Sequence, residues 1–491
     1  MNQEESSGQS ERQWRDDILR RQVRLRCHVI KNLAWNLENG GDFPTPTPQK
    51  LCALIRHTVK MIEDHLNETP ADQLGNVSLF LCSTAEHLRY VERSRTAHTP
   101  WSMIQATEHF LKQQVGEDSH FIIRPQWSYN YSLVGEFVAH YQTSVQSMAW
   151  IPARKWEDGL AAIQLTDNKI YCIAFPRVGR LDALLHANWG HELGHIIAAR
   201  WVHAKFGQIW NGVEDGVKKR IGESIRKSLP ASIEEELFKD LIVEQSISDM
   251  ANTTMEVARH GLTELICDAI GVHLLGPGAL AACLEFSAGL SLDENPLQCR
   301  NYPPWRYRLH LMLDACHGDL KERKIKVNGR ESDYPGEVLR PFCEWLSEGK
   351  QLLAHAGDEP AWRQAIVVRE AYALIEREWK NIRHDVLDLL PGGAEKPYRL
   401  CERHAIIEDL AKKLCDDIPP NEVGCWPNAT PARLEDIVNA AWVFKIKKQI
   451  ENPGWGSPSD YERLCRLALK AIEAGFVDSE FGSRLREVNA T

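Results

Sequence analysis

Two histidines and a glutamate in the segment 182–206 have the spacing of a metal site that activates water. His191, Glu192 and His195 lie in the sequence HELGH. On a helix, residues four apart share one face, so both imidazoles can bind one metal ion. Zinc favours nitrogen and carboxylate ligands, and a catalytic zinc leaves its fourth position to a water molecule whose pKa falls to about 7. Glu192 would accept the proton of that water.

The alternative interpretation is two ordinary histidines on a helix face, because a five-residue pattern recurs by chance in long chains. The residues around the motif favour the metal. An apolar setting predicts a buried helix, and an unpaired glutamate inside a core costs free energy that a metal ion would remove. The apolar neighbours are Leu184, Leu185, Leu193, Ile196 and Ile197.

A third protein ligand is needed, and the segment TELICDAIG provides the best candidate. Glu264 could bind the metal, and Asp268 lies one turn later, where it could accept a hydrogen bond from the second nitrogen of His191. An ordinary pair of helix carboxylates is the alternative, although the flanking residues are apolar. The competing ligands are Asp268, His260 and His273. We therefore predict one zinc ion bound by His191, His195 and Glu264.

The order HExxH and then ExxxD resembles the gluzincin metallopeptidases. Within that group the chain is most similar to the CAAX prenyl endopeptidase and heat-shock membrane peptidase family, in which HPxxxxR and an aliphatic residue follow. The corresponding segment here is YPPWRYRL, in which Pro303 and Arg308 match and Tyr302 replaces the histidine. The resemblance covers about residues 120–313 and implies a zincin-like core. Membrane embedding and prenylated substrates are not carried over, because the chain has no transmembrane segment.

The YPPWRYRL segment also contains candidates for substrate contacts. Pro303 and Pro304 suit the first turn of a helix that continues to Leu313. Arg308 could bind a substrate carboxylate or carbonyl, or it could tie the active-site helices together through Asp or Glu, which is the role we expect. The candidates for stabilising the oxyanion that forms when water attacks a carbonyl are Tyr302, Tyr307 and His310.

Hydrophobic periodicity predicts a mainly α fold with a small β-sheet, an α+β class. Helices are expected at 13–36, 49–66, 77–93 and 101–115. The stretches FIIRP, GLAAIQL and KIYCIAF predict strands, the last two as a hairpin, and Asp182 is the expected N-cap of the metal helix.

Three regions follow from this pattern: an N-terminal helical region at 1–118, a zincin-like catalytic region at 119–320 and a C-terminal helical region at 321–491. Within the catalytic region we expect a helical insertion near 207–250, broken at Pro230. Another helix is expected at 254–275, ended by the sequence GPG.

Composition restricts the partners. The net charge is −10 without a long basic run, which argues against nucleic acid. No apolar run approaches the length that spans a bilayer, about 18 to 20 residues, so no membrane is expected. Thirteen cysteines without a CxxC pair are typical of reduced thiols in a cytoplasmic protein.

Together these observations predict a soluble, cytoplasmic zinc metallopeptidase. We expect a regulated endopeptidase that hydrolyses a dedicated protein or peptide substrate and whose activity is controlled by a regulatory protein partner. The alternative is a zinc-containing scaffold or partner-binding protein with little or no proteolytic turnover. The presence of Glu192 argues against that alternative, because a purely structural zinc site needs no base.

Overall fold

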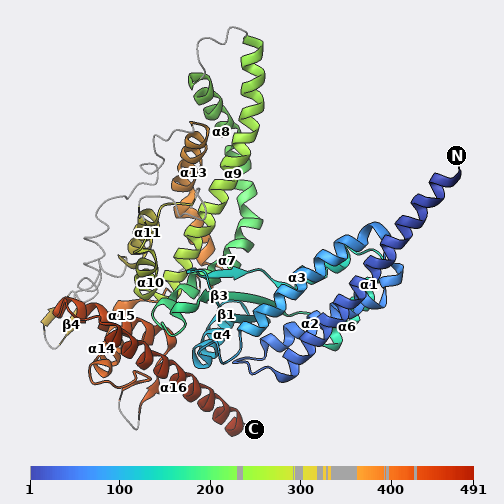
Figure 1. Ribbon diagram of the computed structural model, residues 1–491. Helices are drawn as coiled ribbons and strands as arrows, with labels where there is room; N and C mark the ends of the chain where they lie inside the picture. Colours follow the sequence, from blue (N-terminus) through green and yellow to red (C-terminus); the bar gives the residue numbers. More distant parts are fainter. Residues whose placement is uncertain are drawn as a thin grey trace. The chain divides into compact units, whose positions relative to one another are not determined.

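The computed structural model describes residues 2–228, 236–290, 292, 302–317, 325–327, 330–332, 362–391, 393, 397–424 and 428–490. Its contacts divide the chain into two compact units, Met1–Arg180 and Leu181–Thr491. Figure 1 shows the helices and strands of both units. The fold is mainly helical with a small mixed sheet, which confirms the predicted fold class. The unit boundary lies after the sheet, whereas the sequence placed the sheet in the catalytic region.

The first unit begins with four helices, as the periodicity predicted, and α1 starts earlier than expected. They are α1 (Asn2–Gly40), α2 (Thr47–Asp64), α3 (Leu74–Arg93) and α4 (Trp101–Val115). Apolar residues of α1, α2 and α3 at helical spacing share one core with the sheet and with two later helices, α5 (Phe137–Gln146) and α6 (Ala153–Ala162). That core includes Val23, Leu51, Ile55, Leu81, Ile122, Tyr141, Trp156 and Cys172.

The sheet of the first unit has the order β1-β3-β2, with β1 (Ser119–Gln126), β2 (Ser132–Val134) and β3 (Lys169–Pro176). Strands β1 and β3 are parallel, with Phe121 opposite Tyr171, and β2 is antiparallel to β3. Two of the three predicted strands, FIIRP and KIYCIAF, lie in β1 and β3.

The predicted strand GLAAIQL and its hairpin are wrong, because this stretch belongs to α6 and the turn after it. Trp156 and Leu160 lie one turn apart and are both buried, so the segment buries its apolar residues with helical spacing. The His57 ring stacks on Trp156 with centroids 4.9 Å apart. A short apolar run does not distinguish a strand from a buried helix by periodicity alone.

The second unit is organised around α9 (Glu236–Leu275), the long helix in Figure 1. Helices α7 (Trp189–Trp201), α8 (Gly207–Ser228), α10 (Pro277–Ser287), α11 (Trp305–His317) and α13 (Trp362–Leu387) all contact it. The remaining helices are α14 (Leu400–Cys415), α15 (Leu434–Glu451) and α16 (Pro458–Ala490). Two short strand pairs are β4 (Ile325–Val327) with β5 (Arg330–Ser332), and β6 (Glu422–Val423) with β7 (Thr430–Pro431).

Two local expectations in the second unit need revision. The helix predicted at 254–275 begins at Glu236, so it is continuous with part of the predicted insertion, while the break at Pro230 falls outside the described residues. Asp182 is not the N-cap of α7, because a 3₁₀ turn at Leu185–Asn188 comes first. The Asp182 carboxylate instead accepts a hydrogen bond at 3.0 Å from the amide of Leu185, the first residue of that turn.

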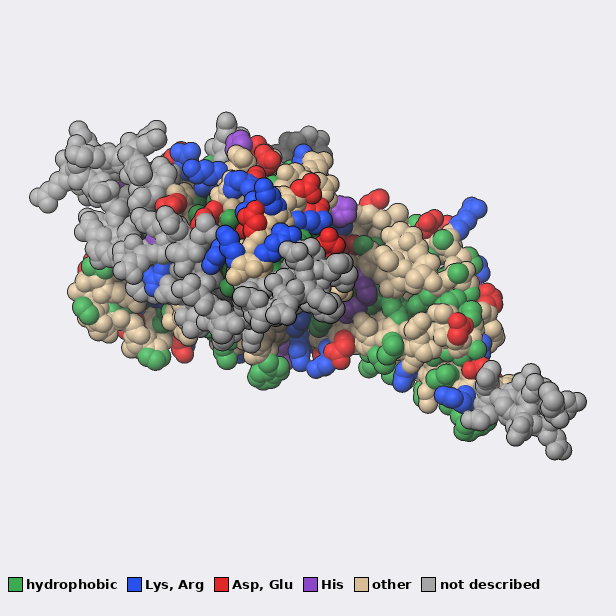
Figure 2. All heavy atoms as spheres, turned by 90° about the horizontal axis from the view of Figure 1, so that it is seen from above, with side chains coloured by type: hydrophobic (Ala, Val, Ile, Leu, Met, Phe, Trp, Pro, Cys, Tyr) green, Lys and Arg blue, Asp and Glu red, His purple; other side chains and the backbone are tan. Residues whose placement is uncertain are grey.

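The surface carries mixed charge. On the face in Figure 2, lysine and arginine side chains of the described residues are interspersed with aspartate and glutamate. Among the helices that the structure describes, none is both long enough and apolar enough to pass through a bilayer.

One buried histidine of the first unit makes its stability depend on pH. His87 on α3 bonds through Nδ1 to the Tyr141 hydroxyl at 2.7 Å, and burial lowers its pKa from 6.5 to about 4. The unfolded chain therefore binds more protons between pH 6.5 and 4, so stability falls as pH decreases through that window. We expect wild type to lose about 2 kcal/mol more than His87→Asn between pH 7 and 4.5 in urea unfolding.

The control for this measurement is His28→Asn, which replaces an exposed histidine of α1. It should leave the steepness of the pH dependence as in wild type. Equal slopes for wild type and His87→Asn would contradict the assignment.

Candidate metal centre

The helices α7 and α9 carry the candidate site and approach each other backbone to backbone. A Cβ atom on Gly194 would lie 2.5 Å from the Cα of Cys267, and one on Gly190 would lie 3.2 Å from the Cα of Gly271. These paired contacts show that the two helices run antiparallel. Gly194 is the glycine of HELGH, so the motif brings its histidines to α9 because that position has no side chain.

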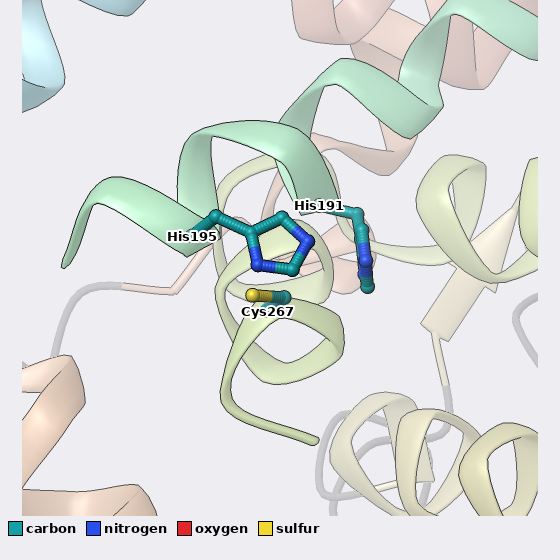
Figure 3. Close-up of side chains that lie close together, drawn as sticks. All are labelled: His191, His195 and Cys267. Atoms are coloured by element: carbon teal, nitrogen blue, oxygen red, sulfur yellow. The ribbon is translucent and has the colours of Figure 1, made fainter. Parts of the chain in front are cut away.

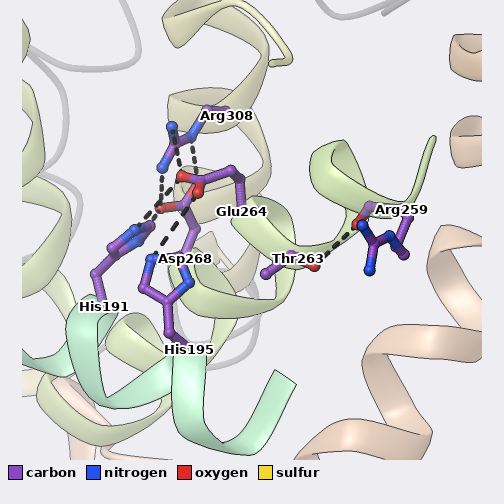
Figure 4. Close-up of polar contacts among 7 residues, drawn as sticks. All are labelled: His191, His195, Arg259, Thr263, Glu264, Asp268 and Arg308. Carbon is purple, nitrogen blue, oxygen red and sulfur yellow. Dashed lines mark hydrogen bonds and ion pairs between the residues drawn. The ribbon is translucent and has the colours of Figure 1, made fainter. Parts of the chain in front are cut away.

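Both histidines of α7 point at one carboxylate of α9 (Figure 4). His191 Nδ1 donates to Asp268 Oδ1 at 2.8 Å, so Nε2 is the ring nitrogen that faces Glu264. That Nε2 lies 3.5 Å from Glu264 Oε2, and His195 Nε2 lies 3.9 Å from Glu264 Oε1. Two imidazole nitrogens and a carboxylate thus converge, which is the ligand set that the sequence predicted for zinc.

Arg308 of α11 holds the two carboxylates of α9. Its Nε and Nη2 donate to Asp268 Oδ2 and Oδ1 at 2.7 and 2.9 Å, and its Nη1 lies 3.1 Å from Glu264 Oε2. The side chain is only 2% exposed, and its guanidinium also lies over the Trp305 ring. Of the two roles considered for Arg308, the contacts fit the structural one, in which Arg308 ties α11 to the carboxylates of α9.

Burial disfavours the charged forms of the side chains in this cluster. For Glu264, Asp268 and His191, the contacts with oppositely charged neighbours outweigh that cost. Burial would raise the pKa of Glu264, but Arg308 and then His191 hold it well below the usual range. The pKa of Asp268 is also lowered, against burial, chiefly by Arg308. For His191 burial would lower the pKa, yet Asp268 and Glu264 raise it to about 10. The pKa of His195 is lowered to about 4, first by burial and then by the nearby charge of His191.

Without a metal, the cations Arg308 and His191 therefore face the carboxylates of Glu264 and Asp268. His195 stays neutral and ready to act as a ligand. A metal ion at His191 Nε2 must displace the proton there, so binding at this site releases a proton.

A second set of ligands is available, because Cys267 lies beside the histidines (Figure 3). Ligand atoms of His191, His195 and Cys267 all lie within 4.8 Å of one another. Burial raises the pKa of the Cys267 thiol well above its usual value, and nearby carboxylates raise it further. Ionising this thiol would add another anion beside Glu264, Asp268 and Glu192. We therefore favour Glu264 as the third ligand and assign Cys267 to packing against Gly194.

The remaining predicted site residues differ in accessibility. Glu192 is buried on α7 beside His191, and its charge acts on the Cys267 thiol. Tyr307 and His310 are buried on α11. Tyr302 is half-buried, with its ring centroid 6.4 Å from that of His260. Of the three oxyanion candidates, Tyr302 is thus the most accessible to a substrate.

Two of the competing ligands, His260 and His273, lie on different faces of α9. His260 lies on the face of α9 that carries Glu264, one turn earlier, but its side chain is 46% exposed and is near Glu256. His273 is nine residues from Glu264, which places it on the opposite face of the helix. It is buried there, and burial lowers its pKa to about 4.

The sequence did not reveal Cys267 or the glycine contacts. The one available signal was the spacing in ELICD, which puts Cys267 three residues after Glu264 and near the same face. No protein-family model, curated protein or solved structure matches the chain. The function must therefore be inferred from the geometry of the site.

Replacing Arg308 should destabilise the second unit strongly. Arg308→Met would leave Asp268 and Glu264 buried without their cation, which costs about 3–5 kcal/mol when one partner of a buried pair is removed. The control is Arg259→Met, since Arg259 on α9 makes an exposed pair with Glu256. It should change the free energy of unfolding by less than about 1 kcal/mol. Similar urea midpoints for the two variants would refute the role of Arg308.

The close helix contact gives another test. Gly194→Ala would place a methyl group against the backbone of Cys267, so we expect a loss of about 1–3 kcal/mol in unfolding free energy. The matched control, Gly212→Ala in α8, meets nothing within 4 Å and should gain about 0.5–1 kcal/mol. Urea unfolding measures both. An unchanged midpoint for Gly194→Ala would mean that the helices are further apart.

Proposed function

We propose that this protein is a zinc metallopeptidase, with His191, His195 and Glu264 as metal ligands and Glu192 as general base. The observation that carries this proposal is the convergence of both histidine Nε2 atoms on the Glu264 carboxylate, with His191 Nδ1 bonded to Asp268. The resemblance of HELGH and ELICD to gluzincins supports it. The substrate class is a peptide bond, and we expect a dedicated protein substrate with a regulatory partner.

Each side chain has a distinct part in the proposed hydrolysis. A zinc ion held at these ligands would supply a Lewis acid that lowers the pKa of water to about 7. Glu192 accepts the proton of the attacking water and delivers it to the leaving amine. Asp268 fixes the tautomer and orientation of His191. Arg308 keeps Glu264 ionised, and Tyr302 is the candidate to stabilise the oxyanion.

Nine cysteines of the described residues are outside disulfides, which supports a reducing compartment and a cytoplasmic location for the proposed enzyme. The mixed surface charge gives no support to a nucleic acid partner.

A second candidate function is a zinc-containing scaffold, and the position of Cys267 favours it. If Cys267 joined the two histidines and Glu264, four protein ligands would close the site and leave no position for water. Such a site would stabilise the fold or a partner interface without turnover.

Three substitutions separate the two candidates. We expect Glu192→Gln to retain zinc and lose cleavage of a quenched fluorescent peptide library by about 100-fold or more. Glu264→Gln should lower zinc content, whereas Cys267→Ala should retain zinc and activity. Zinc is measured by atomic absorption after gentle purification. The control Glu256→Gln, an exposed residue of the same helix as Glu264, should match wild type.

Contrary outcomes are equally specific. Zinc lost from Cys267→Ala, with no cleavage by wild type, would support the scaffold. A wild-type protein that contains no zinc and cannot be reconstituted would overturn both metal-based functions.

A further inference from the structure

Helix α15, in the C-terminal helical region, contacts the junction where α7 begins and α9 ends. Because the helices are antiparallel, the last turn of α9 packs on the first turn of α7: a Cβ atom on Gly190 would lie 3.1 Å from Leu275 Cδ1. The chain then turns at Gly276, whose positive φ of 57° favours glycine, into α10. Movement at this junction would change how the ligands on α7 and α9 face each other.

Asn439 of α15 bonds to both sides of the turn after α9. Its Nδ2 donates to the carbonyl oxygens of Leu275 and Glu435, each at 2.8 Å, and its Oδ1 accepts from the Gly278 amide at 2.9 Å. The side chain is 1% exposed. Its two N–H groups and its acceptor are therefore all used, and two of the three bonds hold the backbone where α9 passes into α10.

Trp442 lies three residues later on the same face of α15 and reaches the start of α7. Its indole Nε1 donates to the Leu184 carbonyl at 3.3 Å, in the turn that leads into the HELGH helix. One face of α15 thus holds the end of one metal-bearing helix and the entry to the other.

The next helix, α16, holds the same entry turn. The Tyr461 hydroxyl lies 2.8 and 2.9 Å from the two carboxylate oxygens of Asp182, which also accepts a hydrogen bond from the Leu185 amide in the turn before α7. Lys445 of α15 lies over the rings of Trp442 and Tyr461 and pairs with Glu285 of α10 at 2.7 Å. These contacts connect α15 and α16 into one support.

We infer that Asn439 and Trp442 are positioning residues of the metal centre, which fix α7 against α9 so that His191 and His195 face Glu264. This inference rests on the proposed metal site and deepens it. It gives the C-terminal helical region a role that its sequence did not show. Helices α15 and α16 stabilise the relative positions of α7 and α9, and none of their residues needs to touch substrate.

The test is metal binding by the full chain, with Co²⁺ as the probe. We expect Asn439→Leu to weaken Co²⁺ binding about tenfold and to alter the visible spectrum, because it removes both bonds to the junction, those to Leu275 and Gly278. Trp442→Phe and Tyr461→Phe, which each keep an aromatic ring and remove one donor, should weaken binding less, about two- to fivefold. The phenylalanine variants keep the test decisive if Asn439→Leu fails to fold.

The matched control is Ile407→Ala, which opens a cavity in α14, a helix that packs on α15. It should lower the urea midpoint and leave both the Co²⁺ affinity and the spectrum unchanged. If the α15 and α16 variants have the same Co²⁺ affinity and spectrum as wild type, the positioning role is overturned and the proposed function is not. A wild-type chain that binds neither Co²⁺ nor Zn²⁺ would instead overturn the proposed function, and the inference with it.

Discussion

Two carboxylates can be buried one turn apart on α9 because the Arg308 guanidinium lies between them. Isolated carboxylates would be strongly disfavoured in this interior, and like charges at this spacing repel. Arg308 binds Asp268 through two nitrogens and Glu264 through the third. With the cation in place, Asp268 is free to orient His191, and Glu264 stays charged and faces both histidines. The charge balance of this cluster thus depends on a residue that belongs to neither α7 nor α9.

The second requirement is steric. Polar groups on α7 and α9 can meet only if the helix backbones come close, and Gly190 and Gly194 permit this. Cys267 occupies the resulting contact, which explains why a thiol lies near the histidines without being the favoured ligand. The proximity that makes Cys267 a geometric candidate is a consequence of helix packing.

The support extends well beyond the residues 182–313 that carry the recognisable motifs. Helices α15 and α16, which follow more than a hundred residues later, bond to the turn before α7 and to the turn after α9. A centre built from two antiparallel helices has a weak point where one begins and the other ends, and this is where the C-terminal helices bind. The first unit has a separate apolar core around its sheet.

Local patterns in the sequence determined the helices, because amphipathic spacing and chain breakers act over a few residues. They also identified HELGH and ELICD as helical segments with polar groups four residues apart. The sequence misassigned GLAAIQL, since a short apolar run fits a strand or a buried helix until its packing partner is known. Likewise, Asp182 precedes a 3₁₀ turn, rather than α7 itself, and no residue pattern predicted that turn. Three features were decided only by the tertiary structure. The histidines face Glu264, Arg308 neutralises both carboxylates, and Asn439 and Trp442 hold the helix ends. These are contacts between residues 40 to more than 250 positions apart, and a single sequence carries no local signal for them.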